Sequence, residues 1–496
     1  MSGELTIGRW IRDRARTTPH RVAIDFLGSE WTYAELDERS ERIAAGLLAR
    51  RLQPGDRVAT LTANSPGHVA VLFACAKAGL ALQPLSWRLS APELAYQLAD
   101  AEPALLLVAP EHEQLAAATG SGLPIAGFGE LEADGDARSV DVRDDALLLL
   151  VYTSGTTGKP KGAVLTHANC FWTNLSFDRT SGLAADDVVL QVLPQYHVGG
   201  WNVQPLLAWW KGARVVLEPV FDAGRALRVI EEQRVTTMMG VPATYLFMAE
   251  SPGFAAADLS SLRLAVVGGA PMPEALLETW HDRGVEIVQG YGLTEAAPNV
   301  LCLPAEDAVR KRGFAGRPYP HVDVALRDPD SGRLLDGPAT GELTVRGPNV
   351  FSGYWRNEAA TAEAFADGWL LTGDVAERDA EGDYRIVGRL KDMVISGGEN
   401  VYPAEIEDVL HAHPAVAEAA VIGVPDERWG EACLAFVALR PGQTASADEL
   451  RVHCRSRVAR FKVPRAVRFV DALPRSGMNK VLKDELRGLV HEEVAP

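Results

Sequence analysis

The sequence predicts an α/β protein in which a large N-terminal domain of parallel βαβ units precedes a short antiparallel part and a small α+β domain. Three observations lead to this fold class. The chain has 496 residues, which is too many for one ordinary hydrophobic core. Short apolar runs alternate with helical patterns along much of its length. From about Asp323 the pattern changes to short strands that are broken by Asp, Gly and Pro.

One βαβ unit is predicted between Leu262 and Gln289. The run LRLAVV has the composition of a buried strand, and GGAPMP forms the loop after it. The segment PEALLETWHDRG then has Pro273 in the first turn of a helix and Gly284 at its end, and VEIVQ is the next strand. In sheets of this kind ligands bind at the carboxyl ends of the strands, so the loops found there are candidate sites.

The C-terminal part has a different pattern of predicted strands and helices. The segment VDVALRDPDSGRLLDGPATGELTVRG reads as antiparallel hairpins. After GRLKD (Gly388–Asp392) the chain has an amphipathic helix in PAEIEDVLHAH, strands in AEAAVIGV and ACLAFVAL, and a helix in ADELRVHCRSRV. We therefore expect a first domain over residues 1–388 and a second over residues 389–496, which is an ordinary domain size.

The composition excludes several classes of function. A net charge of −17 argues against nucleic acid as a partner. The five cysteines are scattered without a C-x-x-C pair, which is typical of buried thiols in a reducing compartment. No signal peptide is visible, and no apolar run approaches the ~18 residues of a membrane span. We expect a cytoplasmic protein.

The segment YTSGTTGKPKG, Tyr152–Gly162, is here called the phosphate loop. It follows the apolar run ALLLLV, and its glycines let backbone amides approach an anion while its hydroxyls and lysines add donors and charge. The P-loop pattern is not met, because Pro160 follows Lys159 where Ser or Thr is required. The alternative is a solvated turn. The candidate phosphate contacts are Thr153, Ser154, Gly155, Thr156, Thr157, Gly158 and Lys159.

A second polar loop, QGYGLTE, ends at Glu295. Its carboxylate suits magnesium, which prefers one or two carboxylates together with phosphate oxygens. Thr294 could donate to a phosphate and Tyr291 could stack on a base. Taken singly, these residues could equally be a helix cap or a core aromatic.

Four further segments contain candidate functional residues. They are His197 in LPQYHVGG, Asp374 in LTGD, the basic and glycine-rich run GRLKDMVISGGENVYPAEIE, and Lys480 in PRSGMNKVLKDELR. The alternatives are a structural histidine, a surface turn and a solvated lysine. The sequence contains neither a G-x-S-x-G elbow nor a dinucleotide-binding G-x-G-x-x-G with a distant acid.

Taken in this order, the motifs resemble the adenylate-forming superfamily of acyl- and aryl-CoA synthetases, the AMP-dependent synthetases and ligases. The resemblance runs from about Thr17 to Arg487. It implies that a carboxylic acid attacks the α-phosphate of ATP, and that CoA then takes the acyl group and releases AMP. It also implies a barrel-like antiparallel part, a mobile C-terminal domain that rotates between half-reactions, and the cofactors ATP, Mg²⁺ and CoA.

The resemblance also implies residue roles. Lys480, Thr294, Glu295 and His197 would be catalytic, with magnesium on Glu295. Lys391 would be the hinge. Besides the phosphate loop, the nucleotide would contact Gly269, Ala270, Gly290, Tyr291, Gly292, Asp374 and Arg389. The acyl group would contact His197, Trp201, Gly268, Gly269 and Ala270. The thiol would approach Ser396, Gly397, Gly398 and Glu399.

The substrate follows from the neighbourhood of His197. No acid is present there to pair with an amino group, and Trp201 is suited to an apolar pocket, so a fatty, aromatic or polycyclic acid is expected. CoA is favoured over a carrier protein because no carrier domain follows Pro496. Asn479 stands where the family has Gly, which leaves open an enzyme that only forms the thioester. A catalytically silent nucleotide-binding protein and a homodimer are further possibilities.

Overall fold

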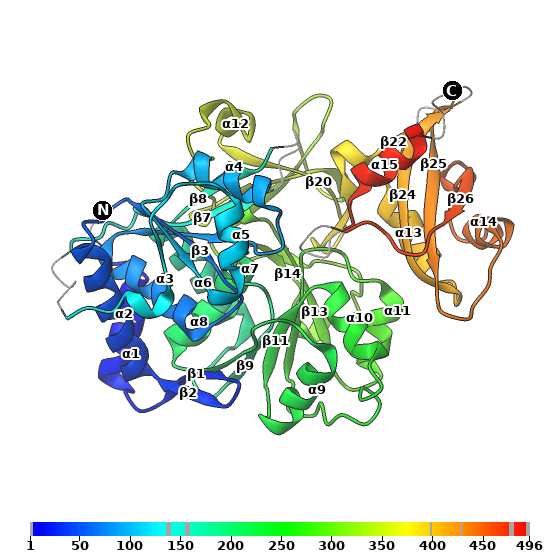
Figure 1. Cartoon of the computed structure of the whole chain (residues 1–496). Coiled ribbons are helices and arrows are strands. Elements are labelled where there is room, and N and C mark those ends of the chain that lie inside the picture. The colour runs from blue at the N-terminus through cyan, green and yellow to red at the C-terminus, as the bar shows by residue number, and fades with distance from the viewer. Residues whose placement is uncertain are drawn as a thin grey trace.

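The computed structural model describes residues 3–134, 140–153, 159–396, 399–426, 429–475 and 481–492. These form an α/β protein with two large, mostly parallel sheets, a curled antiparallel sheet and a small C-terminal domain, which stands to the right of the rest in Figure 1. This arrangement confirms the predicted fold class.

The first sheet contains the phosphate loop between its last two strands. Its strands are parallel except for the final pair, which is antiparallel. In spatial order they are β6 (Ile125–Ala126), β5 (Leu105–Val108), β3 (Arg57–Leu61), β4 (Ala81–Leu85), β7 (Leu147–Thr153) and β8 (Lys161–Thr166).

The second sheet contains the predicted βαβ unit. Its central strands are parallel, and its outermost pairs at each edge are antiparallel. In spatial order the strands are β15 (Arg317–Pro318), β14 (Asn299–Cys302), β13 (Ile287–Gly292), β12 (Leu264–Val267), β11 (Thr237–Gly240), β9 (Val188–Gln191), β10 (Arg214–Leu217), β1 (Val22–Phe26) and β2 (Ser29–Thr32). Helix α11 (Glu274–His281) connects β12 to β13, as predicted.

Helices cover both parallel sheets, and their starts follow local sequence signals. Ser65 caps the helix that begins at Pro66, and Thr32 with Glu35 forms a capping box before Tyr33. The helices of this part are α1 (Gly8–Thr17), α2 (Tyr33–Ala49), α3 (Pro66–Ala78), α4 (Ala91–Ala101), α5 (Glu113–Ala118), α6 (His167–Ser181), α7 (Gly199–Asn202), α8 (Pro205–Lys211), α9 (Ala223–Glu232), α10 (Pro242–Glu250) and α12 (Glu358–Glu363). The 3₁₀ helices are η1 (Pro110–His112), η2 (Phe128–Glu130), η3 (Thr294–Ala296), η4 (Ala305–Asp307), η5 (Leu390–Asp392) and η6 (Arg460–Lys462).

The third sheet begins at the residue where the pattern of the sequence changes. All of its pairs are antiparallel, which confirms the hairpins predicted from Asp323. Its strands are β17 (Leu334–Leu335), β16 (Asp323–Arg327), β18 (Ala339–Arg346), β20 (Trp369–Arg378), β19 (Phe365–Ala366) and β21 (Tyr384–Arg389).

The C-terminal domain has hydrophobic cores on both faces of its sheet. Val421 packs into one cluster and its neighbour Ile422 into another, as expected for alternating strand residues. The strands are β23 (Glu399–Val401), β22 (Val394–Ser396), β25 (Gly430–Leu439), β24 (Val416–Asp426) and β26 (Ala466–Phe469). The helices are α13 (Pro403–His411), α14 (Ala447–Arg455) and α15 (Lys483–Glu492).

Two global predictions can be compared with the described residues. None of the helices there is long and apolar enough to cross a membrane. All five cysteines are unpaired; Cys302 is partly exposed and the other four are buried. Burial raises the pKa of every one of these thiols, so they are held in the protonated form.

Candidate active site

The phosphate loop joins two paired strands of the first sheet. Thr153 ends β7 and pairs with Lys161, the first residue of β8. Ser154, Gly155, Thr156, Thr157 and Gly158 lie outside the described residues. The Lys159 ammonium lies 5.8 Å from the centre of the Tyr96 ring, and that of Lys161 lies 5.2 Å from the Tyr354 ring. Aromatic rings therefore flank both lysines at the end of the loop.

Glu295 lies next to the start of this loop. It belongs to η3, which follows β13 and begins with Thr294. Its Oε1 accepts hydrogen bonds from the Tyr354 hydroxyl at 2.8 Å and from Thr153 Oγ1 at 3.4 Å. The structure thus brings together a predicted phosphate contact and the predicted magnesium ligand, although 142 residues separate them.

The glycines of QGYGLTE allow the backbone of this loop to pass close to its neighbours. A side chain at Gly292 would place its Cβ 1.9 Å from the Pro298 carbonyl oxygen, which no residue other than glycine permits. At Gly290 the corresponding Cβ would lie 3.4 Å from the Leu301 oxygen. Gly292 is therefore required for the turn that leads to Glu295.

Three predicted nucleotide residues meet at a single carboxylate. The Tyr291 hydroxyl donates to Asp374 Oδ2 at 2.6 Å, and Arg389 Nε lies 2.8 Å from Oδ1. Asp374 is buried, and it faces Arg389 across the β20–β21 pair. Burial, followed by the charge of Asp374, raises the pKa of Tyr291 well above 10, so its hydroxyl remains a donor.

The predicted acyl contacts after β12 lie beside the nucleotide contacts. Gly268 is buried, whereas Gly269 and Ala270 are exposed, and Gly269 has a φ of +82°. A Cβ at Gly268 would lie 3.1 Å from Met239 Cε and 3.4 Å from the Gly290 oxygen. The loops after β12 and β13 are therefore adjacent, as the βαβ prediction requires.

His197 and Trp201 lie in different surroundings. His197 is partly exposed; burial and then Arg88 lower its pKa to about 3, so its ring is neutral. Its Nε2 has no hydrogen-bond partner among the described residues. Trp201 is fully buried and packs edge-on against His68, with ring centres 5.0 Å apart. Trp201 is thus part of the main core, and its role in an acyl pocket stays a prediction.

The predicted hinge lies in η5, between the third sheet and the C-terminal domain. Lys391 is its middle residue, and the next residue, Asp392, forms an ion pair with Arg487 of α15 at 2.7 Å. Ser396 is buried and pairs with Glu399 across the β22–β23 turn. Gly397, Gly398 and Lys480 lie outside the described residues.

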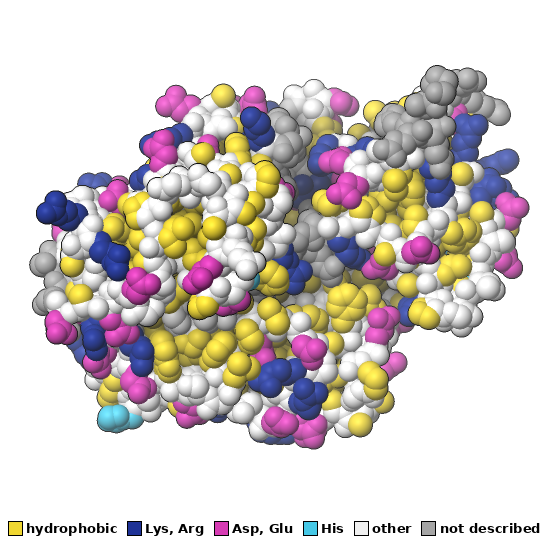
Figure 2. Space-filling view, viewed as in Figure 1, with side chains coloured by type: hydrophobic (Ala, Val, Ile, Leu, Met, Phe, Trp, Pro, Cys, Tyr) yellow, Lys and Arg dark blue, Asp and Glu magenta, His cyan; other side chains and the backbone are white. Residues whose placement is uncertain are grey.

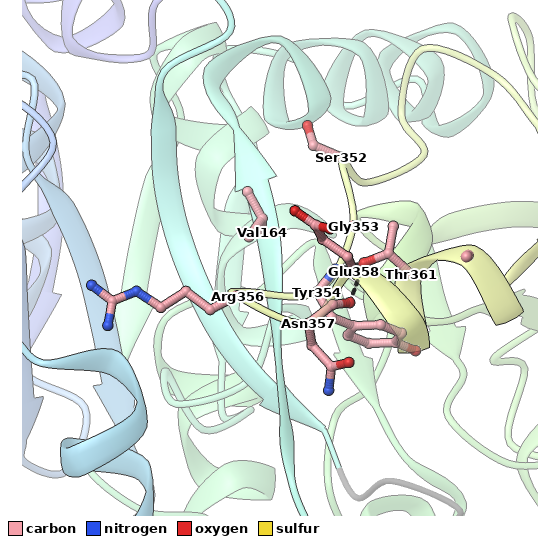
Figure 3. A pocket seen from close by; sticks show the side chains of 9 residues that line it. Val164, Ser352, Gly353, Tyr354, Arg356, Asn357, Glu358 and Thr361 are labelled. Atoms are coloured by element: carbon pink, nitrogen blue, oxygen red, sulfur yellow. Dashed lines mark hydrogen bonds between the residues drawn. The ribbon is translucent and has the colours of Figure 1, made fainter.

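Tyr354 is a site residue that the sequence did not single out. It follows Gly353 in FSGYW, and an aromatic residue after a glycine is too common to be a specific signal. Beyond the contact with Glu295, Tyr354 is one of the residues that line a pocket of about 460 Å³, shown in Figure 3. The lining residues are Val164, Ser352, Gly353, Tyr354, Arg356, Asn357, Glu358, Thr361 and Ala362.

The polar groups suit one divalent cation held jointly with phosphate. Within the described residues no cluster of three or more His, Cys, Asp or Glu side chains could hold a metal alone. Glu295 supplies one hard oxygen donor beside the phosphate loop, which matches the way magnesium binds with nucleotides. The structure thus places Glu295 beside Thr153, and the loop after β12 beside the loop after β13.

The chain matches known families along most of its length. Residues 11–355 match the profile described as AMP-binding enzyme, and residues 405–480 match AMP-binding enzyme C-terminal domain. A feruloyl-CoA synthase of Amycolatopsis sp is 45% identical over 97% of this chain and 98% of that protein. An indoleacetate–CoA ligase of Aromatoleum aromaticum is 42% identical over 98% of each.

Solved structures agree with these matches. ATP-bound MatB from Rhodopseudomonas palustris is 33% identical and superposes with a TM-score of 0.92 over 100% of both chains. The o-succinylbenzoate CoA synthetase MenE of Bacillus subtilis, in complex with its acyl-adenylate intermediate, is 34% identical with a TM-score of 0.88. Its match covers 96% of this chain and 97% of that one.

Proposed function

We propose an aromatic carboxylic acid as the substrate of this chain, which belongs to the AMP-binding enzyme family and is an ATP-dependent acid–CoA ligase. The reaction joins the acid to AMP with release of pyrophosphate, and then transfers the acyl group to the CoA thiol. CoA ligases among the relatives favour this reaction over the two alternatives, thioester formation alone and the loading of a carrier protein.

The observation that carries the site assignment is the meeting of Thr153 with Glu295 next to the phosphate loop. Lys159 and the hydroxyls of the loop would neutralise the triphosphate, and Asp374 with Arg389 would hold the ribose. Glu295 would hold magnesium, which when bound supplies positive charge to the phosphates.

The second half of the mechanism depends on the C-terminal domain. Lys480 would lie between the carboxylate and the α-phosphate, stabilising the negative charge that develops there. We propose that residues 389–496 then rotate about Lys391 and bring Ser396 and Glu399 towards the thiol. His197 is neutral, so it can contact a carboxylic acid without adding charge.

Two arguments favour an aromatic acid: the names of similar proteins and the small side chains of the predicted acyl site. The relatives that are 45% and 42% identical are named for ferulate and indoleacetate. Gly268, Gly269 and Ala270 add little or no side chain to the predicted acyl site, which suits a flat ring. A fatty acid is the second candidate, because a long-chain fatty acid ligase of Mycobacterium tuberculosis is 37% identical.

CoA as the acceptor has support from charge. Between Arg451 and Arg468 the chain has seven Arg and Lys residues and no Asp or Glu. Arg455, Arg457 and Arg460 are exposed and have no acidic partner within 4 Å among the described residues. Figure 2 shows Lys and Arg gathered on the C-terminal domain at the right of the view. Such a surface suits the phosphates of CoA.

The proposed function can be tested with a panel of acids. Purified protein would receive ATP, Mg²⁺ and ferulate, indoleacetate or palmitate, with and without CoA, and products would be read by mass spectrometry. We expect AMP and an aryl-CoA, with kcat/KM at least ~10-fold higher than for palmitate. Preference for palmitate would contradict the aromatic substrate. Absence of AMP with every acid would instead favour a silent nucleotide-binding protein.

A homodimer and a cytoplasmic location are also proposals. Five unpaired cysteines support a reducing compartment. Light scattering after gel filtration would distinguish a 53.4 kDa monomer from a dimer of twice that mass.

A further inference from the structure

The segment Phe351–Trp355 runs along the strand that leaves the phosphate loop. The Val164 amide donates to the Gly353 oxygen at 3.0 Å, and the Trp355 amide donates to the Gly162 oxygen at 2.7 Å. Tyr354 itself forms an antiparallel bridge with Ala163. The backbone of this segment is therefore held in place by β8.

The same segment holds Glu295 at two points. The Phe351 amide donates to the backbone oxygen of Glu295 at 2.8 Å, and the Tyr354 hydroxyl donates to its Oε1 at 2.8 Å. The Lys161 ammonium lies over the ring of the same tyrosine. Tyr354 therefore connects the end of the phosphate loop with the predicted magnesium ligand.

The two oxygens of Glu295 have different surroundings. Hydrogen bonds to this carboxylate from residues that the structure describes all reach Oε1, and they come from Tyr354 and Thr153. Oε2 is left to accept a cation. Partners that orient a metal ligand in this way usually affect metal affinity nearly as much as the ligand does.

We propose that Tyr354 is a positioning residue for the divalent cation: its hydroxyl fixes Oε1 of Glu295 and thereby presents Oε2 to the cation that accompanies ATP. The inference rests on the proposed function, which places magnesium on Glu295. It predicts a defect confined to the half-reaction that uses the metal. Thioester formation from a finished adenylate needs no triphosphate, and so it needs neither the metal nor its orientation.

The test is Tyr354→Phe, which removes the hydroxyl and keeps the ring that lines the adjacent pocket. With the acid found active in the panel, we expect the Mg²⁺ concentration for half-maximal adenylation to rise about 10- to 100-fold. Thioester formation from supplied adenylate and CoA should stay within about 3-fold of the parent protein. Mn²⁺ titration by electron paramagnetic resonance, with α,β-methylene-ATP present, should show the same weakening without any turnover.

The matched control is Tyr33→Phe, which also removes a buried phenol hydroxyl. That hydroxyl donates to the Ala213 oxygen at 2.6 Å, away from Glu295. We expect both Mg²⁺ and Mn²⁺ dependence to be unchanged in this control. An unchanged Mn²⁺ affinity in Tyr354→Phe, or an equal loss in both half-reactions, would overturn the inference. A parent protein that makes no adenylate would contradict the proposed function instead, so the two failures are distinguishable.

Discussion

The large N-terminal region and the small C-terminal domain differ in how far their polar contacts are buried. In the large region Asp374 is buried, and its Oδ2 accepts a hydrogen bond from the Tyr291 hydroxyl at 2.6 Å. In the C-terminal domain Arg440 is joined to Glu250 of α10 by an ion pair at 3.6 Å, and both of these side chains are about half exposed.

This difference in burial fits a fixed nucleotide site in the large region and a movable C-terminal domain. Buried hydrogen bonds are costly to break, so a nucleotide site built from them is ready before the substrate arrives. Exposed ion pairs contribute less than about 1 kcal/mol each, so they can be exchanged when a domain moves. The large region would thus bind, and the small one would change position between half-reactions.

The largest effect is expected for Lys480→Ala. Removing the charge that we propose stabilises the first transition state should lower adenylation roughly 10³-fold, about 4 kcal/mol. Thioester formation from supplied adenylate should change little, because in the proposed rotation the lysine would then have left the site. Both rates can be measured by AMP release and by CoA consumption. The control is Lys483→Ala, whose ammonium pairs with Glu407 at 2.7 Å. Equal loss in both half-reactions of the Lys480 variant would contradict the domain rotation.

Acid should destabilise the large region. His68 and His167 are buried, and burial lowers the pKa of each from about 6.5 to about 3. Below pH 6.5 the unfolded chain binds protons that the folded one does not, so stability is lost as pH falls from 6.5 towards 3. At pH 5 the loss should be about 4 kcal/mol for the two residues together.

Tryptophan fluorescence during urea unfolding measures this loss, because ten of the eleven tryptophans precede residue 389. His167→Gln should reduce the difference between pH 7.5 and pH 5 by about 2 kcal/mol. A difference under ~1 kcal/mol in the parent protein would show that these rings titrate normally.

Asp374→Ala should have an intermediate effect. It removes the predicted ribose contact and leaves the Tyr291 hydroxyl without its acceptor, which costs about 1–3 kcal/mol of stability. The KM for ATP should rise about 10- to 100-fold, about 1.4–2.7 kcal/mol. Steady-state kinetics and thermal unfolding measure the two effects. Asp323→Ala, which removes an exposed ion pair with Arg346 of the same antiparallel sheet, should change neither. An unaltered KM would remove Asp374 from the nucleotide site.

The smallest effect is expected for Arg440→Gln, which breaks the ion pair with Glu250. Both side chains are about half exposed, so the free energy of unfolding should change by less than ~0.5 kcal/mol and either half-reaction by less than ~2-fold. Chemical denaturation and the two partial assays would show this. A change above ~1 kcal/mol would mean that the domains are tied more tightly than the comparison suggests.

The fold was largely predictable because its signals are local. The strand–helix–strand unit after Leu262 appears as β12, α11 and β13, and Gly284 beyond the helix has a φ of +75°. Hairpins from Asp323 were equally visible, since strand alternation and turn residues act over a few positions.

The site was predictable only in part, because its contacts join distant segments. Glu295 and Asp374 came from motifs, but nothing local shows that Tyr291 binds Asp374, 83 residues away. Tyr354 lies 59 residues from Glu295, and its segment has no polar cluster to mark it. Long-range pairing of β8 with that segment, which brings the tyrosine to the carboxylate, becomes visible only in the folded chain.

The burial of the cysteines has a consequence for redox chemistry. A ligase that handles free CoA works beside a reactive thiol, which can form mixed disulfides with any accessible protein thiolate. Burial keeps all five cysteines protonated, so few protein thiolates are available for exchange with CoA. CoA disulfide should therefore not inactivate the enzyme, and one engineered surface cysteine would be labelled almost alone.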